Sequence, residues 1–199
     1  IPNGIELTGV SRVDVRKVLR ERLRLPAHEA VAVYPARFTA HKNHKFLLKV
    51  LARIKGLHLV LTSDGVEKES FMNEARDKGL LNRITLTGNV SSEAMRDYYS
   101  AADICLFPSM QEGFGVAIIE AMMAGLPTVI FQRIYMQEHG KNILVAENEE
   151  EFIDYASRLI TDDKYRNELS QRVILDARKC SISASTDAYI SLCQKLIAS

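Results

Sequence analysis

One short segment of the sequence places a single carboxylate among apolar residues. In QEGFGVAIIEAMMAGLP, residues 111–127, Glu120 is the only ionisable residue between Glu112 and Arg133. The residues around it are apolar on every face of a helix, which predicts a helix buried all round. An isolated carboxylate there is costly unless a partner binds it or it stays protonated. Glu120 therefore has either a core arginine or lysine as its partner or a ligand.

The residues that precede this helix favour the ligand. Gly113 and Gly115 flank Phe114 and lack a Cβ, so backbone amides there can approach an anion closely. A helix N-terminus carries a partial positive charge and suits a phosphate. Glu120 lies about 7.5 Å further along the helix axis, a distance that suits the ribose of a bound nucleotide diphosphate. A carboxylate only accepts hydrogen bonds, so it could bind both ribose hydroxyls.

A second segment, PARFTAHKNHK, contributes positive charge. Arg37 follows the first predicted strand and Lys42 precedes the next predicted helix, so both are expected at the carboxyl edge of the sheet. Two cations there could neutralise a diphosphate without metal, each charge-assisted bond contributing about 1.5–3 kcal/mol. The alternative is a pair of solvated surface cations, and His44 and Lys45 are expected to be solvated surface residues.

The sequence predicts no metal site and lacks several other catalytic motifs. There is no Asp-x-Asp motif, and the five histidines show neither HxxxH nor HxH spacing. His58 alternates within a predicted strand and is expected to be a packing residue. No GxGxxG follows the first strand, and no P-loop or Gly-x-Ser-x-Gly motif occurs, which argues against a dinucleotide dehydrogenase, a P-loop NTPase and a serine hydrolase.

The elements that would position these residues alternate along the chain. Such alternation predicts βαβ units and a parallel sheet covered on both faces, an α/β Rossmann-like doubly wound fold whose ligands bind beyond the carboxyl ends of the strands. Gly125 and Pro127 should end the central helix. Residues from 149 onward read as helix with breaks near Thr161 and Ser181. Strands are predicted at 30–34, 57–61, 84–86, 104–107 and 128–131, and helices at 43–54, 67–78, 92–101 and 116–124.

Length and composition fit one ordinary globular domain. The 199 residues are 47% hydrophobic and 26% charged, and 26 Lys and Arg against 25 Asp and Glu give a net charge of +1. Overall charge therefore gives no indication of a nucleic-acid partner, and none is expected. We expect a single domain over 1–199, with a lead-in at 1–26 and a terminal helix at 183–198. Because the chain begins with Ile1, we expect it to be part of a longer protein or a processed form of one.

Cysteine usage and hydropathy bear on the compartment. Cys105, Cys180 and Cys193 are odd in number, far apart and without zinc-ligand spacing, which favours a reducing compartment. No signal peptide and no apolar run long enough to span a bilayer is evident. We expect a cytoplasmic protein.

With these residues identified, the chain resembles the C-terminal, donor-binding domain of a retaining GT-B glycosyltransferase of the family-4 type (glycosyl transferases group 1). The resemblance covers nearly the whole chain. Residues 1–5, IPNGI, resemble the segment that enters this domain from the N-terminal one. Arg37 and Lys42 match the family's Arg-x4-Lys pair, and Glu112 and Glu120 match its E-x7-E signature, which is specific when it is embedded in EGFG…EA..AG.P as here.

The resemblance implies roles for individual residues. Arg37, Lys42 and Glu112 would be catalytic, and Glu120 would hold the ribose. Glu112 and the amides of the following loop would face the donor sugar and distal phosphate, and the loop at 88–90 would contact the base through Val90. The implied nucleotide-sugar site comprises Arg37, Lys42, Val90, Glu112, Gly113, Phe114, Gly115, Val116 and Glu120.

The resemblance also implies an activity and its partners. The full protein would transfer a sugar from a UDP- or GDP-linked donor to an acceptor, with retention of configuration and without metal or other cofactor. A missing N-terminal domain would bind the acceptor and supply further catalytic groups, including a histidine that none of the histidines here replaces. This chain alone would bind nucleotide without turnover, and any membrane association would come through the missing half.

The chain departs from the family pattern at two places. The family often has Gly-Asp-Gly-Pro after the second strand, whereas this chain has Ser63-Asp64-Gly65-Val66, so that loop is left out of the predicted site. The family's tail often carries an aromatic anchor, frequently tryptophan, and this chain has no Trp. The sequence therefore does not predict whether the final helix docks onto the other domain.

Two alternatives share the expected fold. One is a GT-B sugar-nucleotide epimerase. The spacing of Glu112 and Glu120, with the GFG segment between them, favours a transferase over this epimerase. The other is a non-catalytic flavodoxin-like or response-regulator-like interaction domain. A response regulator would need an acidic cluster at the end of the first strand, which is absent here, and neither interaction domain needs Glu120.

Overall fold

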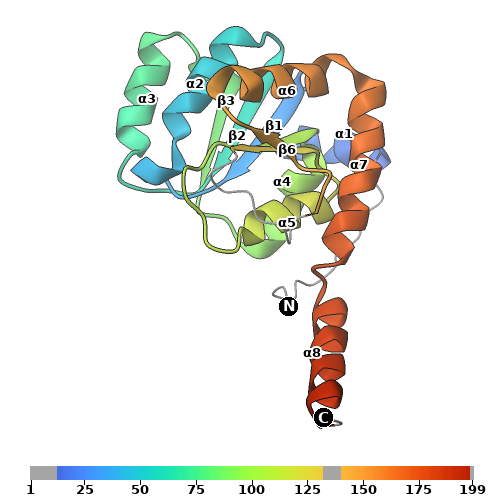
Figure 1. Cartoon of the computed structure of the whole chain (residues 1–199). Coiled ribbons are helices and arrows are strands. Elements are labelled where there is room, and N and C mark those ends of the chain that lie inside the picture. Colours follow the sequence, from blue (N-terminus) through green and yellow to red (C-terminus); the bar gives the residue numbers. More distant parts are fainter. Residues whose placement is uncertain (1–12, 132–139, 198–199) are drawn as a thin grey trace.

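The strands form one parallel sheet. A computed structural model describes residues 13–131 and 140–197, in which six strands have the order β3-β2-β1-β4-β5-β6 (Figure 1). Each neighbouring pair is parallel. The α/β, doubly wound, Rossmann-like architecture is confirmed. The strands are β1 (Ala30–Pro35), β2 (Leu57–Thr62), β3 (Ile84–Gly88), β4 (Ile104–Phe107), β5 (Thr128–Phe131) and β6 (Leu144–Ala146).

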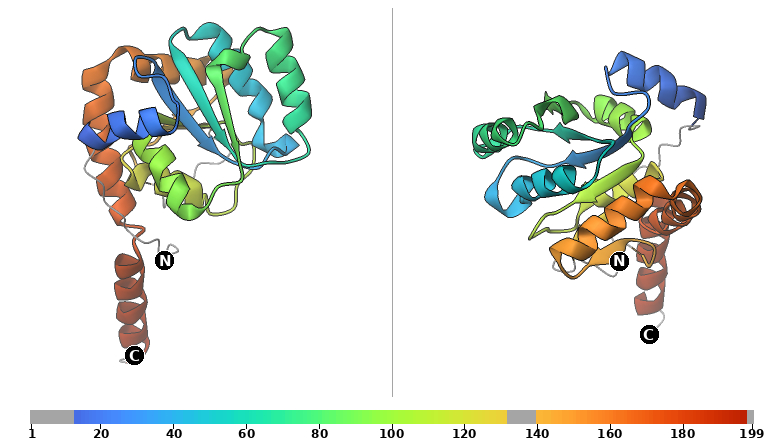
Figure 2. Two further views of the ribbon diagram at one scale, coloured as in Figure 1. Left: turned by 180° about the vertical axis from the view of Figure 1, so that it is seen from behind. Right: turned by 90° about the horizontal axis from the view of Figure 1, so that it is seen from above.

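Helices cover both faces of this sheet (Figure 2). One face carries α2 (His44–Arg53), α3 (Lys68–Asp77) and α6 (Glu149–Thr161), and the other carries α1 (Val13–Arg22), α4 (Ser92–Ala101), α5 (Val116–Met123) and α7 (Asp163–Arg178). Short 3-10 turns, Ala40–Lys42 and Leu81–Arg83, precede α2 and β3. The predicted terminal helix is present as α8 (Ile182–Ile197), which extends away from the sheet (Figure 1).

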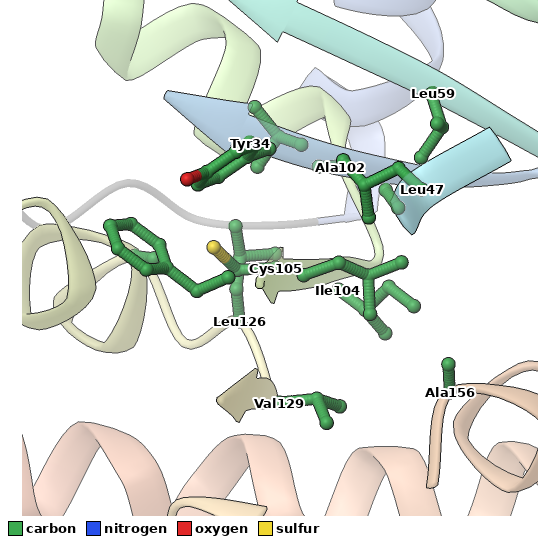
Figure 3. Packing of buried hydrophobic residues seen from close by; sticks show 14 of the residues in the cluster. Tyr34, Leu47, Leu59, Ala102, Ile104, Cys105, Leu126, Val129 and Ala156 are labelled. Carbon is green, nitrogen blue, oxygen red and sulfur yellow. The ribbon is translucent and has the colours of Figure 1, made fainter. Parts of the chain in front are cut away.

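The core lies between the sheet and its two helical layers. All residues of β2, β4 and β5 are buried, as expected for aliphatic strands covered on both faces. Figure 3 shows Tyr34 of β1 beside Ile104 and Cys105 of β4, with Leu47 of α2 in the same cluster. His58 is buried in β2, and its Nε2 lies 2.8 Å from the Thr85 hydroxyl, which confirms it as a packing residue.

Two elements were not predicted from the sequence. α1 falls within the expected lead-in, where its charged composition gives little apolar signal. Buried ion pairs hold it instead: Asp103 pairs with Arg20 at 2.6 Å and with Arg16 at 2.9 Å. The strand β6 has three residues, too few for a periodic pattern. Residues 1–5, which resemble an interdomain segment, lie outside the described residues.

The central helix α5 is less buried than its composition predicts. Ile118, Ile119 and Met122 are buried, but Val116 is 45% exposed and Glu120 is partly exposed. The cause is position: α5 packs against β4, β5 and α7, whereas its first turn reaches the carboxyl edge of the sheet. The predicted C-terminal stop is confirmed, because Gly125 adopts a φ of +67° just after the helix.

The described residues contain no helix that is both long enough and apolar enough to cross a membrane.

Candidate functional site

Two loops meet where the strand order reverses. The chain runs from β1 to β2 on one side and reaches β4 on the other, so the loops after β1 and β4 lie side by side at the carboxyl edge. Such a switch point is the usual ligand crevice of an open α/β sheet. The Met110 amide donates to the His41 carbonyl at 2.8 Å, and the Asn43 side-chain amide donates to the Pro108 carbonyl at 3.4 Å. These bonds fix the loops relative to each other.

The two loops also bring Lys42 and Glu112 together. The Lys42 ammonium pairs with Glu112 Oε1, and the two side chains are only 17% and 11% exposed. Beneath them the Tyr34 hydroxyl donates to the Lys42 carbonyl at 2.8 Å and lies 2.7 Å from the Ser109 hydroxyl. Burial raises the pKa of Tyr34, so the phenol keeps the proton that it donates. Sequence reasoning selected Lys42 and Glu112 but missed Tyr34 and Ser109, which support them.

Arg37 lies on the same loop and is exposed. Within residues 13–131 and 140–197 its guanidinium forms no ion pair. The loop after β2 holds the backbone next to Arg37 in place. The Phe38 amide donates to the Asp64 carbonyl at 3.0 Å, and the Glu67 amide donates to the Phe38 carbonyl at 3.0 Å. A Cβ on Gly65 would lie 2.4 Å from the Phe38 carbonyl oxygen. The loop that sequence reasoning left out therefore supports Arg37, and Gly65 was the available signal.

The expectation that His44 is a solvated surface residue is wrong. His44 is 3% exposed, and its ring stacks on Phe38 with centroids 4.0 Å apart. Its Nε2 lies 3.2 Å from the Ala36 carbonyl, so it joins α2 to the start of the Arg37 loop. The signal was present: Leu47 and Leu51, three and seven positions later, place His44 on the apolar face of α2. Lys45 is exposed, as expected.

The buried His44 should make the fold sensitive to acid. Burial lowers the pKa of His44 from 6.5 to about 4, with the Lys42 charge acting in the same direction and the Ala36 bond opposing it. Between these values the unfolded chain binds a proton that the folded chain does not, so stability falls as the pH falls from about 6.5 toward 4. This group should remove about 2 kcal/mol between pH 7 and pH 5, measured by urea unfolding.

Two substitutions isolate this contribution. Burial also lowers the pKa of His58, so some loss below neutral pH will persist without His44. His44→Phe should nevertheless flatten the pH dependence by about 2 kcal/mol relative to wild type, whatever its absolute stability. His28→Gln, at an exposed position, should leave the slope unchanged. Equal slopes in wild type and His44→Phe would contradict the assignment.

The first turn of α5 is open to an anion. Gly115 is its N-cap with a φ of +71°, a conformation that favours glycine, and no side chain caps this end. The first amides of a helix have no acceptor within the helix. Gly113 borders open space, since a Cβ there would meet nothing within 4 Å. Phe114 packs partly against the core and the Val116 side chain is 45% exposed, so the first turn of α5 lies at the protein surface.

Glu120 has a phenol as its partner rather than a cation. The Tyr99 hydroxyl, from α4, donates to Glu120 Oε2 at 3.2 Å. In the described part of the chain no arginine or lysine pairs with Glu120. Burial raises the pKa of Glu120, and the Tyr99 bond opposes that rise. The core-cation alternative therefore does not describe the environment of Glu120. Sequence reasoning missed Tyr99, which belongs to a different helix.

Val90 lies apart from these groups. It follows β3, whose end is separated from β4 by three strand spacings, or about 14 Å. Gly88 turns the chain with a φ of +67°, and the Ser63 amide donates to its carbonyl at 2.8 Å. The Ser63 hydroxyl also donates to Asn89 Oδ1 at 3.2 Å. No described contact joins Val90 to Lys42 or Glu112. The predicted residues thus form two groups at one edge, the switch-point loops with the adjoining helix α5 and the separate loop after β3.

No group of three or more His, Cys, Asp or Glu side chains within the described ranges is arranged to hold a metal ion.

Comparison with known proteins identifies the family. The family model for glycosyl transferases group 1 matches residues 15–175. A lipopolysaccharide core biosynthesis glycosyltransferase, LpsE, of Rhizobium meliloti is 28% identical over 191 residues, which cover 93% of this chain and 55% of that protein. Sucrose-phosphate synthase from Thermosynechococcus elongatus superimposes with a TM-score of 0.83 at 26% identity, over 100% of this chain and 52% of that one.

A further solved structure has the same fold. Anabaena Alr3699/HepE, in complex with UDP and glucose, superimposes with a TM-score of 0.83 at 19% identity, over 96% of this chain and 55% of that one. The chain thus spans about half the length of each of these three relatives. Together with the doubly wound parallel sheet, these matches establish that the chain belongs to the glycosyl transferases group 1 family and has the fold of a GT-B C-terminal domain.

Proposed function

We propose that this chain is the donor-binding domain of a retaining, metal-independent glycosyltransferase that uses a UDP- or GDP-linked sugar. The observation that carries the proposal is the meeting of Lys42 and Glu112 at the switch point, directly before the open first turn of α5. Together they offer positive charge and backbone amides for a diphosphate and a carboxylate for a sugar. The fold shared with HepE, solved with UDP and glucose, supports a nucleotide sugar as the ligand.

The proposed donor lies along the carboxyl edge of the sheet. Its diphosphate contacts Arg37, Lys42 and the amides that begin α5, where Gly113 and Gly115 leave room for it. Glu112 contacts the donor sugar, and Glu120 accepts hydrogen bonds from the ribose hydroxyls. The base extends toward Val90, in the direction of β3. The spacing of about 14 Å between the ends of β3 and β4 is consistent with an extended ligand.

The chemistry follows from charge. In the transfer step the bond between the anomeric carbon and the phosphate oxygen breaks, and its electron pair stays with the diphosphate. An acceptor hydroxyl forms the new bond to the anomeric carbon, and its proton passes to the departing diphosphate oxygen. Arg37, Lys42 and the α5 amides stabilise the charge on the departing diphosphate, which is an effect largest in the transition state. Lys42 exchanges its contact with Glu112 for one with phosphate, which frees Glu112 for the sugar.

The other half of the reaction belongs to the rest of the protein. Since the chain spans about half of its relatives, we propose that the remaining part binds the acceptor and completes the catalytic site. This chain alone then binds nucleotide without turnover. The proposed setting is cytoplasmic, with any peripheral contact at the inner membrane face made by the other half and with no nucleic-acid partner.

Calorimetric titration of the chain tests the proposal. UDP, GDP and ADP are titrated separately in EDTA and again with added Mg²⁺, and at least one should bind with the same affinity in both conditions. The corresponding sugar nucleotides should bind at the same site and compete with that nucleotide. If none of the nucleotides or sugar nucleotides binds, the proposal is wrong, and binding only with metal added would contradict metal independence.

Glu120→Gln tests the ribose contact. At a nucleotide concentration about 100 times Kd, binding should stabilise the wild-type chain by about 2.7 kcal/mol and raise Tm by roughly 5–10 °C. Glu120→Gln loses the charged acceptor, so about half of this rise should disappear while the Tm without nucleotide changes little, measured by thermal melting.

Glu149→Gln is the matched control. Glu149 forms only an exposed pair with Lys49 on α2 and is remote from the switch-point loops, so its variant should keep the full nucleotide-induced rise. Should Glu120→Gln lower Tm equally with and without nucleotide, Glu120 has a structural role and the ribose assignment fails.

A further inference from the structure

We propose that Tyr99 is a positioning residue of the nucleotide site, whose hydroxyl holds Glu120 so that its carboxylate is ready to accept the ribose hydroxyls. The inference rests on the proposed function, because it concerns the orientation of the carboxylate assigned to the ribose. Tyr99 belongs to α4 and Glu120 to α5, so the contact joins two helices on the same face of the sheet.

The Tyr99 hydroxyl has two acceptors on α5. It lies 3.2 Å from Glu120 Oε2 and 3.4 Å from the Ala117 carbonyl oxygen. One hydroxyl proton cannot serve both fully, and the carboxylate is the shorter contact and the charged acceptor, which makes it the stronger of the two. The Ala117 carbonyl lies nearly one helical turn before Glu120, so the two contacts together fix the phenol over the first two turns of α5.

The contact leaves one side of the carboxylate available. Tyr99 binds Oε2, and no hydrogen bond to Oε1 is described between residues 13 and 131 or 140 and 197. A carboxylate has about four lone-pair positions, so one phenol leaves acceptor capacity for a diol. Tyr99 therefore restricts the rotation of the Glu120 side chain without saturating it, and a side chain ordered before binding loses less entropy when the ligand arrives.

Burial keeps Tyr99 in the donor role. Its side chain is 4% exposed, and burial together with the Glu120 charge raises its pKa well above the ordinary value. The phenol is thus protonated throughout the range in which nucleotide binding would be measured. As a neutral phenol it is a weaker acceptor than the Glu120 carboxylate, and its hydrogen bond opposes the effect of burial on the Glu120 pKa.

The competing explanation is that Tyr99 only packs between α4 and the core. The neighbouring Tyr98 separates the two explanations, because it lies on the same helix, packs partly against the core and has no hydroxyl hydrogen bond in the described structure. Tyr99→Phe and Tyr98→Phe remove the same atom from adjacent positions. Packing predicts similar small effects for both, whereas positioning predicts a nucleotide-specific effect for Tyr99 alone.

The test compares a nucleotide with its 2′,3′-dideoxy form. The probe is whichever of UDP, GDP and ADP binds the wild-type chain most tightly, and the quantity measured is the ratio of the two dissociation constants. In wild type the dideoxy form should bind about tenfold more weakly. Tyr99→Phe should lower this ratio about threefold to fivefold by weakening only the ribose form, while Tyr98→Phe leaves the ratio unchanged.

Glu120→Gln distinguishes failure of the inference from failure of the proposed function. It should bring the ratio close to one, and adding Tyr99→Phe to it should cause no further change, since the phenol acts through the carboxylate. If Glu120→Gln lowers the ratio and Tyr99→Phe does not, the positioning role is overturned and the ribose assignment stands. If neither substitution lowers the ratio, both the positioning role and the ribose assignment are wrong. Equal weakening of both nucleotide forms by Tyr99→Phe would overturn the inference in favour of packing.

A spectroscopic measurement covers the case in which Tyr99→Phe does not fold. The chain is labelled with 3-fluorotyrosine, and the Tyr99 signal is assigned by its contact with α5 and by comparison with Tyr98→Phe. The ribose nucleotide should shift the Tyr99 fluorine resonance, and the dideoxy form should shift it much less. Identical shifts with both ligands would overturn the inference.

Discussion

Under the proposed function, Lys42→Ala in the full-length protein is expected to lower kcat/KM for sugar transfer by about 10²–10³-fold, the loss typical when a preorganised group that stabilises transition-state charge is removed. Lys42 lies at the switch point, its side chain is 17% exposed and its backbone is bonded to Tyr34. The substitution removes a cation from the proposed diphosphate site and leaves Glu112 without its partner. An unpaired carboxylate then repels the diphosphate, so the loss exceeds that of an exposed lysine.

The measurement is the rate of sugar transfer from the donor, with Lys45→Ala as the matched control. Lys45 is exposed and lies on the first turn of α2, three residues from Lys42, so its removal changes net charge equally. Lys45→Ala should leave kcat/KM within about twofold of wild type. If the two variants lose activity equally, long-range charge rather than contact explains the effect, and the role given to Lys42 is wrong.

Asp103→Ala is expected to lower the free energy of unfolding by about 3–5 kcal/mol. The carboxylate pairs with Arg20 and Arg16 and accepts the Val31 amide at 2.7 Å. Arg20 is 7% exposed, so the variant would bury a guanidinium without its countercharge and an amide without an acceptor. For a chain of this size the Tm should fall by roughly 10 °C. Urea unfolding with tryptophan-independent detection, such as circular dichroism, measures the change.

Asp97→Ala provides the comparison for Asp103. Asp97 of α4 pairs with Arg22 and so is likewise joined to α1, but the Asp97 side chain is 40% exposed and the Arg22 side chain 57%. Exposed pairs contribute about 0–1 kcal/mol, and the variant should lose no more than that. Since Asp103 lies at the amino end of β4, its variant should bind nucleotide normally once folded. A similar small loss in both variants would show that the buried network does not hold α1.

The fold was predictable where periodic patterns were long enough. The aliphatic segments at 30–34 and 104–107 identified β1 and β4, and the turn chemistry of Gly125 identified the end of α5. β6 was missed because three residues give no pattern, and α1 because it is held by ion pairs that depend on the remote Asp103. Composition also overstated the burial of α5, because the burial of Val116 depends on where the helix begins relative to the sheet.

The site was predictable only in part. Lys42 and Glu112 could be selected because each follows a strand, and strands of one parallel sheet bring such residues to a common edge. Tyr99 and Ser109 could not, because their contacts depend on how neighbouring elements pack rather than on local spacing. His44 was misjudged although the helical period placed it inside.

The positions of the Asp103 network and of the switch-point loops are at opposite ends of the strands. The residues that anchor α1 are thereby separated from the loops that are proposed to bind the nucleotide sugar. Under that proposal, substitutions in these loops change the ligand preference without disturbing the Asp103 network. This separation offers a physical reason why one fold can serve relatives as different as a lipopolysaccharide glycosyltransferase and a sucrose-phosphate synthase.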